Sequence, residues 1–410
     1  MKSRTLIWIL SIALLLALAY IFLPDGGRKF HQSSVPITEV DLTQAEVIKI
    51  ALDSPRINKI SEIFQKVTYL PLELTEHSKI IETRDLIFTD DMILVWDGEG
   101  RKIVGFDHEG KYLFNIYKKG ASKKEYGELT DFTYDKEKNQ IIIVSYDQIL
   151  WYDLEANYVR SFHTNYARLS AVAQLSGSRI ASFSVYGNSD SSLEAASLNI
   201  IDENGELLSR YLPFNRAIQF STVLGLYDNM SSSESGHLFA LPYSRTVYFL
   251  PHTGGLQAKY ELDFGEANLP KGIEDAVFTN KFLSSSQANS FLVKNNWAKL
   301  VAVPQETDDM VFIPFEYQKQ RFYAYYDKHS KAVKYHNIAK SNDIDGNDFY
   351  APITTFKGSF VSWATANQLK ESVKNGLVKD STILEQINQL QPNDNPVLRF
   401  VKIKDFLYLR

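Results

Sequence analysis

One short run of the sequence has side chains that suit a metal ion. Asp343, Asp345, Asn347 and Asp348 fall within six residues, and carboxylate and amide oxygens are the ligands that Ca²⁺ prefers. The run departs from an EF-hand loop, because Gly346 stands at the fourth position and no glutamate follows at the twelfth. Asp and Asn are also favoured in tight turns. We expect a turn here, and Asp343 and Asp345 are the candidate ligands if Ca²⁺ binds.

A second group of side chains could contact a ligand. Lys123, Lys124, Glu125 and Tyr126 offer two cations, an acid and an aromatic ring within four residues. They lie in a polar stretch, Lys118–Glu128, between two strand-like runs. We expect this loop to form part of one rim of a central channel, where the four side chains are candidate ligand-binding residues. The alternative is that Glu125 and Tyr126 brace neighbouring elements by hydrogen bonding and packing.

Other patterns that indicate catalysis are missing from the sequence. The chain has no cysteine, which excludes disulfides, thiol nucleophiles and thiolate metal sites. Its eight histidines form no H-x-H or H-x-x-x-H pair, and no G-x-S-x-G elbow or phosphate-binding glycine loop occurs. A pair of glycosidase carboxylates cannot be recognised from sequence, because the two groups must meet in space. No catalytic residue is therefore predicted.

The charge of the chain indicates whether it suits a nucleic-acid partner. The formal net charge is −5 and the sequence pI is about 6.0. No basic stripe is present that could release counterions from a phosphate backbone. We therefore expect no nucleic-acid partner.

The first residues indicate a membrane segment. Lys2 and Arg4 precede an apolar run over residues 5–23, which as a helix would span about 28 Å, close to the bilayer core. The positive charge before the run predicts that the N-terminus stays inside and the remainder lies outside. Residues 1–24 form either an uncleaved signal anchor, which we favour, or a signal peptide. The run lacks the small residues of a cleavage site. The expected location is periplasmic or extracytoplasmic, held at the inner membrane through residues 5–23.

A repeat in the sequence predicts the strands and turns that must position these side chains. An apolar run, a charged or Gly-containing turn and a second apolar run recur at Ile103–Ile116, Ile149–Phe162, Leu198–Tyr211, Val247–Tyr260 and Tyr323–Tyr335. Equivalent positions, taken in order along the chain, are separated by 46, 49, 49 and 76 residues. Such a period, built on short strands and tight turns, is typical of a β-propeller. The fold class is therefore all-β, with several blades.

The number of blades follows from the chain ends. Five blades are expected over residues 85–116, 129–162, 169–212, 220–264 and 299–338. A sixth would combine residues 349–363 and 396–404 with the early strand Lys66–Leu74, because pairing the two ends of the chain removes a free edge. The long step reflects a helical insertion over Gly265–Trp297 before blade five, and Ala366–Gln391 reads as a helix near the C-terminus. The predicted organisation is an anchor or signal over 1–24, a tether and lead-in over 25–65, and a six-bladed propeller over 66–405.

The chain resembles a known group of proteins at several places. The segments are VTYLPLE (67–73), FDHEGKYL (106–113), GASKKEYGELTDF (120–132), NDIDGNDFYAP (342–352) and DNPVLRFVKIK (394–404). They are similar to the six-bladed β-propeller proteins of Bacteroides-type bacteria, which are related in architecture to NHL-repeat and TolB-like propellers. The family loop reads G-x-G-P-G-E-Y. This chain keeps Gly120, Glu125 and Tyr126 but has Ser122-Lys123-Lys124 in place of Gly-Pro-Gly. The resemblance implies the fold and the compartment, since most members have no assigned activity.

Two functions remain open from the sequence. The first is a non-catalytic periplasmic propeller that binds a ligand, an envelope protein or a glycan through its loops. The second is a metal-dependent hydrolase or lactonase-like enzyme, with a metal held in the central channel by acids from several blades. The second predicts carboxylates that converge at one mouth of the channel.

Overall fold

The computed structural model describes residues 33–53, 56–164, 169–184, 196–213, 230–233, 235–241, 244–270, 273, 285–337, 342–346 and 351–406. The predicted anchor over 1–24 lies outside these ranges. Within them, no helix has both the length and the apolar character required to cross a membrane.

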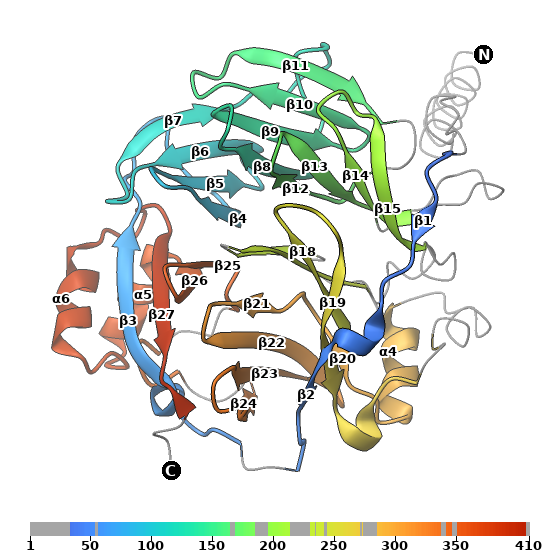
Figure 1. Ribbon diagram of the computed structural model, residues 1–410. Helices are drawn as coiled ribbons and strands as arrows, with labels where there is room; N and C mark the ends of the chain where they lie inside the picture. Colours follow the sequence, from blue (N-terminus) through green and yellow to red (C-terminus); the bar gives the residue numbers. More distant parts are fainter. Residues whose placement is uncertain are drawn as a thin grey trace, which may run out of the picture.

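Six antiparallel sheets surround a common centre, so the predicted six-bladed propeller is confirmed (Figure 1). Blade one has β4 (Thr83–Phe88), β5 (Ile93–Asp97), β6 (Lys102–Phe106) and β7 (Tyr112–Ile116). Blade two has β8 (Asp131–Asp135), β9 (Gln140–Ser145), β10 (Gln148–Tyr152) and β11 (Tyr158–His163). Blade three has β12 (Ala171–Leu175), β13 (Arg179–Phe183), β14 (Ala196–Ile201) and β15 (Leu207–Pro213).

The remaining blades follow the same order, from the inner strand to the outer. Blade four has β16 (Met230–Ser233), β17 (Gly236–Ala240), β18 (Thr246–Pro251) and β19 (Gln257–Asp263). Blade five has β20 (Lys299–Leu300), β21 (Gln305–Glu306), β22 (Met310–Tyr317), β23 (Gln320–Asp327) and β24 (Val333–Asn337). Blade six has β25 (Thr354–Phe356), β26 (Ser359–Ala364), β27 (Val397–Ile403) and β3 (Phe64–Pro71).

The hydrophobic core lies between neighbouring blades rather than in one central mass. A strand inside a blade is covered on both faces, so its sequence is a continuous apolar run. All five residues of β5 are buried, as are Ile141–Ser145 of β9. One cluster joins Trp96 and Ile103 of blade one to Phe132 and Ile141 of blade two, and similar clusters join blades three to four and four to five. Burial of these faces supplies the main free energy that holds the ring together.

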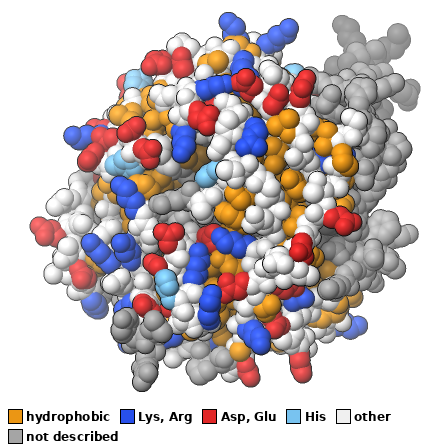
Figure 2. All heavy atoms as spheres, in the orientation of Figure 1, with side chains coloured by type: hydrophobic (Ala, Val, Ile, Leu, Met, Phe, Trp, Pro, Cys, Tyr) orange, Lys and Arg blue, Asp and Glu red, His pale blue; other side chains and the backbone are white. Residues whose placement is uncertain are grey.

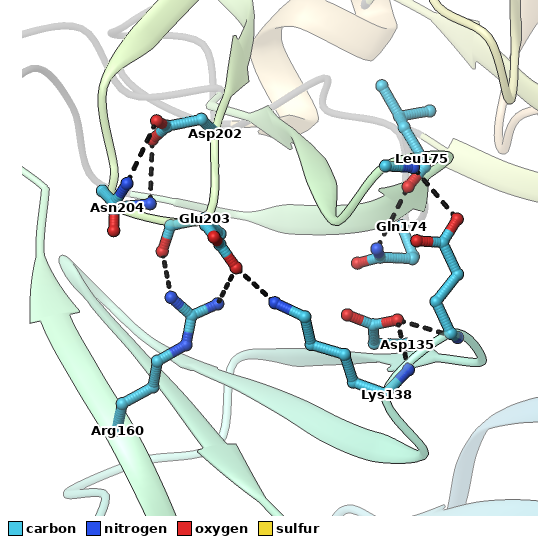
Figure 3. Close-up of polar contacts among 10 residues, drawn as sticks. Asp135, Lys138, Arg160, Gln174, Leu175, Asp202, Glu203 and Asn204 are labelled. Atoms are coloured by element: carbon cyan, nitrogen blue, oxygen red, sulfur yellow. Dashed lines mark hydrogen bonds and ion pairs between the residues drawn. The ribbon is translucent and has the colours of Figure 1, made fainter.

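Polar contacts tie blades two and three at their outer parts (Figure 3). Glu203, in the turn between β14 and β15, forms an ion pair with Lys138 of blade two. The guanidinium of Arg160, on β11, reaches the same residue and donates to its backbone carbonyl. Arg160 also lies over the ring of Trp151, 4.1 Å from its centroid. These contacts add polar links between two blades that an apolar cluster already joins.

The two ends of the propeller meet in blade six. Strand β3 pairs antiparallel with β27 from Val397 opposite Pro71 to Ile403 opposite Phe64. The expected closure by Lys66–Leu74 and the C-terminal strand is thus confirmed. It fixes the ring by hydrogen bonds between segments that are more than three hundred residues apart in sequence.

The chain before β3 wraps around the outside of the ring. Strand β1 (Ile37–Thr38) pairs parallel with β15, and β2 (Glu46–Lys49) pairs parallel with β19, so blades three and four each have a fifth strand (Figure 1). The N–H of Ile57 then donates to the carbonyl of Tyr335 on blade five, at 2.9 Å. We call residues 35–53 and 56–63 the N-terminal belt.

The described helices lie on the periphery. Helix α4 (Ser285–Lys294) falls within the insertion expected before blade five, alongside β20 (Figure 1). The C-terminal helical segment differs from the expectation, because it is two helices, α5 (Ala366–Lys374) and α6 (Ser381–Gln389). Asn375 caps the first, and Gly376 has a left-handed φ of +66° that a continuing helix cannot accommodate. Asp380 then accepts hydrogen bonds from the first turn of α6.

Candidate functional site: the central cavity

A cavity of about 150 Å³ lies where the six inner strands begin. Every blade contributes to its wall, through β4, β8, β12, β16, β21 and β25 or the residue just before them. Figure 2 shows one face of the molecule hollowed at its centre, over the point where the inner strands meet in Figure 1. Much of the wall carries hydroxyl and amide groups, from Thr130, Thr133, Ser170, Ser231, Ser232, Gln305 and Thr354.

Two carboxylates and one guanidinium also line the cavity. Asp85 and Asp131 stand at the same kind of position, near the start of the inner strands of blades one and two. Each is held by a backbone N–H: that of Leu86 donates to Asp85 at 2.8 Å, and that of Val172 to Asp131 at 2.6 Å. Arg84 is exposed and its guanidinium carbon lies 5.6 Å from the centroid of the Trp96 ring. These charges make the wall slightly acidic.

Among the described residues, two buried polar atoms of wall residues have no hydrogen-bond partner. They are the indole Nε1 of Trp96 and the side-chain oxygen of Gln305. Both side chains belong to the cavity wall, and the two residues are 7 % and 6 % exposed. The amide nitrogen of Gln305 donates to the carbonyl of Ile353 at 3.3 Å, which fixes the amide orientation and leaves the oxygen as an acceptor. Buried polar groups are nearly always paired, so these two atoms are exceptions among the residues of the wall.

Ser232, which also lines the cavity, forms a hydrogen bond with His237. The hydroxyl oxygen lies 3.0 Å from Nδ1, and Nε2 lies 3.1 Å from the backbone carbonyl of Gln174. Because the carbonyl can only accept, Nε2 carries the hydrogen and Nδ1 accepts from Ser232. Burial, aided by the neighbouring His252, lowers the pKa of His237 to about 4. Ser232 and His237 are arranged like a nucleophile and its general base. A base with so low a pKa accepts a proton poorly at neutral pH, so His237 is too weak a base to activate the hydroxyl.

The structure places the loop Lys118–Glu128 away from the channel. The carbonyl of Lys124 accepts from the hydroxyl of Tyr152 at 2.8 Å, and that of Lys123 accepts from Ser161, so the two lysines lie beside the outer strands of blade two. Their exposed ammonium groups stay candidate ligand contacts on this outer surface. They do not line the cavity wall.

The other two residues of that group hold the loop in place. Tyr126 is fully buried, and its hydroxyl donates to the carbonyl of Arg101 on blade one at 2.8 Å. Burial raises its pKa to about 12. Glu125 accepts from the backbone N–H of Ser122 at 2.9 Å, and these hydrogen bonds lower its pKa. A Cβ on Gly120 would lie 2.1 Å from the Glu125 carboxylate, which would have to move to accept it. These contacts are the ones expected if Glu125 and Tyr126 brace neighbouring elements, which was the alternative to ligand binding.

The candidate calcium ligands have protein partners. Asp345 is completely buried and accepts from Tyr69 at 2.7 Å, from Arg399 at 2.8 Å and from the side chain of Asn342 at 2.5 Å. Asp343 accepts from the backbone and hydroxyl of Ser61. Asn347 and Asp348 lie outside the described residues. Among the residues that the structure describes, no group of three or more acidic or histidine side chains could hold a metal ion. The calcium site stays a prediction.

The cavity residues were missed because nothing local marks them. Trp96 and Gln305 are far apart in the sequence, in blades one and five, and each lies in an ordinary strand pattern. The repeat did contain one usable signal, since the first residue of the inner strand lines the cavity and is polar in blades two, five and six.

The fold and the cavity define this protein as a six-bladed β-propeller. Residues 45–402 match the model of DUF4934, a domain of unknown function, so the chain belongs to that family. A protein of Bacteroides fragilis that is predicted to be exported has a similar structure, with a TM-score of 0.72 and 18% identity over 88% of this chain and 100% of that one. A DUF4221 protein of Bacteroides vulgatus is more distant, with a TM-score of 0.46 and 10% identity over 83% and 97% of the two chains. No curated protein matches. The expected resemblance to Bacteroides propellers is confirmed.

Proposed function

We propose that this protein is a non-catalytic binding module of the cell envelope, and that the central cavity is its ligand site. The observation that carries the proposal is a cavity to which all six blades contribute and whose wall carries several hydroxyl and amide side chains. Ligand sites are typically concave and display a few fixed polar groups. The module would face the periplasm and be held at the inner membrane by residues 5–23, and we expect no nucleic-acid partner.

Three further points support this location and role. The positive charges before an apolar run favour an inserted N-terminus with the rest outside. The chain has no cysteine to oxidise in an extracytoplasmic compartment. The similar Bacteroides fragilis protein is itself predicted to be exported.

The alternative is a hydrolase or lactonase-like enzyme with a metal in the channel. Asp85 and Asp131 in the cavity wall favour it, since they come from adjacent blades as that mechanism requires. Addition of Zn²⁺ or Ca²⁺ to the purified chain, with ester and lactone substrates, tests this directly. Turnover that disappears in D85N and D131N would establish the enzyme and refute our proposal.

The binding proposal is tested by capture from an envelope extract. The full chain in detergent is immobilised beside a variant with the cavity filled, A171W, and a control with the same substitution on the exposed loop, A121W. Material retained by the wild type and A121W but lost from A171W identifies a cavity ligand, provided that A171W keeps the wild-type circular dichroism spectrum. If all three proteins retain the same material, the cavity is not the site.

A further inference from the structure

The outer strands of the blades differ in how their free edges are covered. Strands β15 and β19 pair with β1 and β2 of the N-terminal belt. In blade five the belt supplies a hydrogen bond to the carbonyl of Tyr335, on β24. In blade one the N–H of Tyr112, on β7, donates to the carboxylate of Glu73 at 2.8 Å. In blade six β3 carries Lys66, a charge that discourages strand addition, and lies beside α6 (Figure 1).

Strand β11 of blade two has none of these covers. It is the last strand of its sheet, and among the residues that the structure describes no strand or backbone group of another blade bonds to residues 158–162. It contains no proline or lysine, the residues that commonly guard an edge. Its arginine, Arg160, is turned toward Trp151 and Glu203. Figure 1 shows β11 as the outermost strand of blade two.

The edge of β11 matches an edge that already accepts a parallel strand. The last hairpins of blades two and three each have a bulge at the same place, after Trp151 and after Ile200. Counted from the bulge, Ser161 on β11 corresponds to Arg210 on β15. Arg210 is the residue that stands opposite Ile37 of β1. The bulge therefore leaves this part of the edge open to a further strand.

The backbone groups of Ser161 point away from the blade. The N–H of Thr164 donates inward to the carbonyl of Asp147 at 2.7 Å, and the register from there to Ser161 is regular. Inward and outward residues alternate along an antiparallel strand, so Phe162 bonds to β10 and Ser161 is directed outward. Outward N–H and C=O groups on a strand edge are a template for a strand from another chain.

The surroundings of this edge favour an acidic partner. The carbonyl of Lys123 accepts from the hydroxyl of Ser161 at 3.4 Å, and Nζ of Lys124 lies 5.9 Å from the centroid of the Tyr158 ring. Both lysines are exposed, and the acid next to them, Glu125, is engaged by the N–H of Ser122. Val159 of the same strand is 42% exposed and offers an apolar contact. A segment that pairs here can therefore place its carboxylates beside two ammonium groups.

We propose that the outer edge of β11 is a docking site for an extended, acidic segment of another protein, which adds to blade two as a fifth strand parallel to β11. The segment pairs with the backbone around Ser161 and directs its carboxylates to Lys123 and Lys124. A second copy of this chain fits less well, because pairing β11 with β11 would bring both lysine pairs to one face of the joined sheet. The site is separate from the cavity and does not depend on the proposed function.

The probe is a fluorescent peptide taken from the belt. Residues 44–52 include β2, which pairs parallel with an outer strand of this fold. The substitution K49E gives the peptide two acids, one on each face of a strand, so either face can meet the lysines. Two control peptides share its length. One carries E46K instead and is basic, and the other carries K49E with I48P, which keeps the acids but interrupts strand pairing.

The protein is the full chain in detergent, with three variants. S161P removes the outward N–H and places a ring on the edge, a position that tolerates proline because no hydrogen bond of the blade is lost. S161A is the matched control, since it loses only the hydroxyl. K123E/K124E reverses the charge beside the edge. Binding is measured by fluorescence anisotropy at low salt, and its place by hydrogen exchange of residues 158–162.

The acidic peptide should bind and slow exchange in β11, and the basic and proline peptides should bind more weakly. S161P should weaken binding by about tenfold or more, through a lost hydrogen bond and a steric block, whereas S161A should change it by less than about twofold. K123E/K124E should weaken the acidic peptide by about threefold to tenfold, as expected for two exposed ion pairs, and should strengthen the basic one.

Other outcomes overturn the inference. Equal binding of the proline peptide would show that charge alone attracts the probe, without strand addition. Binding that ignores S161P and protects β19 would show that the peptide displaces β2. A dimer in sedimentation that S161P dissociates would make a second copy the occupant. Absence of binding refutes the proposal outright. If S161P lacks the wild-type unfolding transition, the exchange of peptide preference in K123E/K124E, together with protection of β11, decides the matter.

Discussion

Replacement of Asp345 by alanine should destabilise the protein strongly and without any dependence on calcium. The carboxylate is buried and is the ion-pair partner of Arg399, whose side chain is 4% exposed. Removing one partner of a buried ion pair leaves the other charge uncompensated, which costs about 3–5 kcal/mol. Tyr69 and Asn342 also lose their acceptor. Against a total stability of about 5–15 kcal/mol, a loss near 4 kcal/mol is large.

The assay is urea unfolding of the wild type, D345A and D343A, each in EDTA and in millimolar Ca²⁺. D343A is the matched control, since the half-buried carboxylate of Asp343 pairs with Ser61 and its loss should cost about 1 kcal/mol. The double variant D345L/R399M removes both charges together. It should be clearly more stable than D345A, because apolar residues of similar size tolerate the site better than one unpaired charge.

Three results would refute this reasoning. A loss below 1 kcal/mol in D345A would show that the buried ion pair contributes little. A double variant no more stable than D345A would place the cost in packing rather than in charge. A wild-type protein stabilised by Ca²⁺, with the stabilisation absent in D345A, would show that Asp345 is a calcium ligand after all.

Further predictions concern other described contacts. In the folded protein, burial lowers the pKa of His237 to about 4, so the side chain is neutral at pH 6.5. In the unfolded chain the same side chain binds a proton near pH 6.5. The free energy of unfolding should therefore fall by about 3 kcal/mol as the pH drops from 6.5 to 4. Urea midpoints across this range test it, and H237Q should flatten the slope; an unchanged slope would contradict the assignment. Y126F should cost about 1–2 kcal/mol, because it leaves the carbonyl of Arg101 without its donor; a neutral effect in thermal unfolding would argue against the bracing role. G120A should be more damaging than G127A, because only the first Cβ would collide with Glu125, whereas Gly127 has space; equal melting temperatures would show that the loop relaxes freely.

The strand order of the ring could be predicted because each hairpin carries its own signal. Runs such as Gln140–Ser145 and turns such as Asp107–Gly110 are read locally, without knowledge of the partner. Closure by β3 and β27 was also predictable, since it is the arrangement that leaves no free edge. The break between α5 and α6 was missed although Asn375-Gly376 is a helix-ending pair, because the apolar positions continue on both sides of it.

The belt and the cavity could not be predicted, for a physical reason they share. Strands β1 and β2 have only two and four residues. Such short strands form because β15 and β19 present a free edge to them, and their own sequences carry no recognisable strand pattern. The cavity likewise depends on how residues from six blades converge once the ring has closed. Sequence signals within one element carry no information about either arrangement.

The N-terminal belt has a mechanical consequence. Tension applied at the start of the chain would reach β1 on blade three first, then β2 on blade four, and then the contact of Ile57 with blade five. Strand β3, whose hydrogen bonds to β27 close the ring, would be loaded last. Each step has its own backbone pairing to break before the next is loaded: two residue pairs at β1, four at β2 and one hydrogen bond at Ile57. The joint on which the ring depends is thereby protected from a pull at the chain's own N-terminal end.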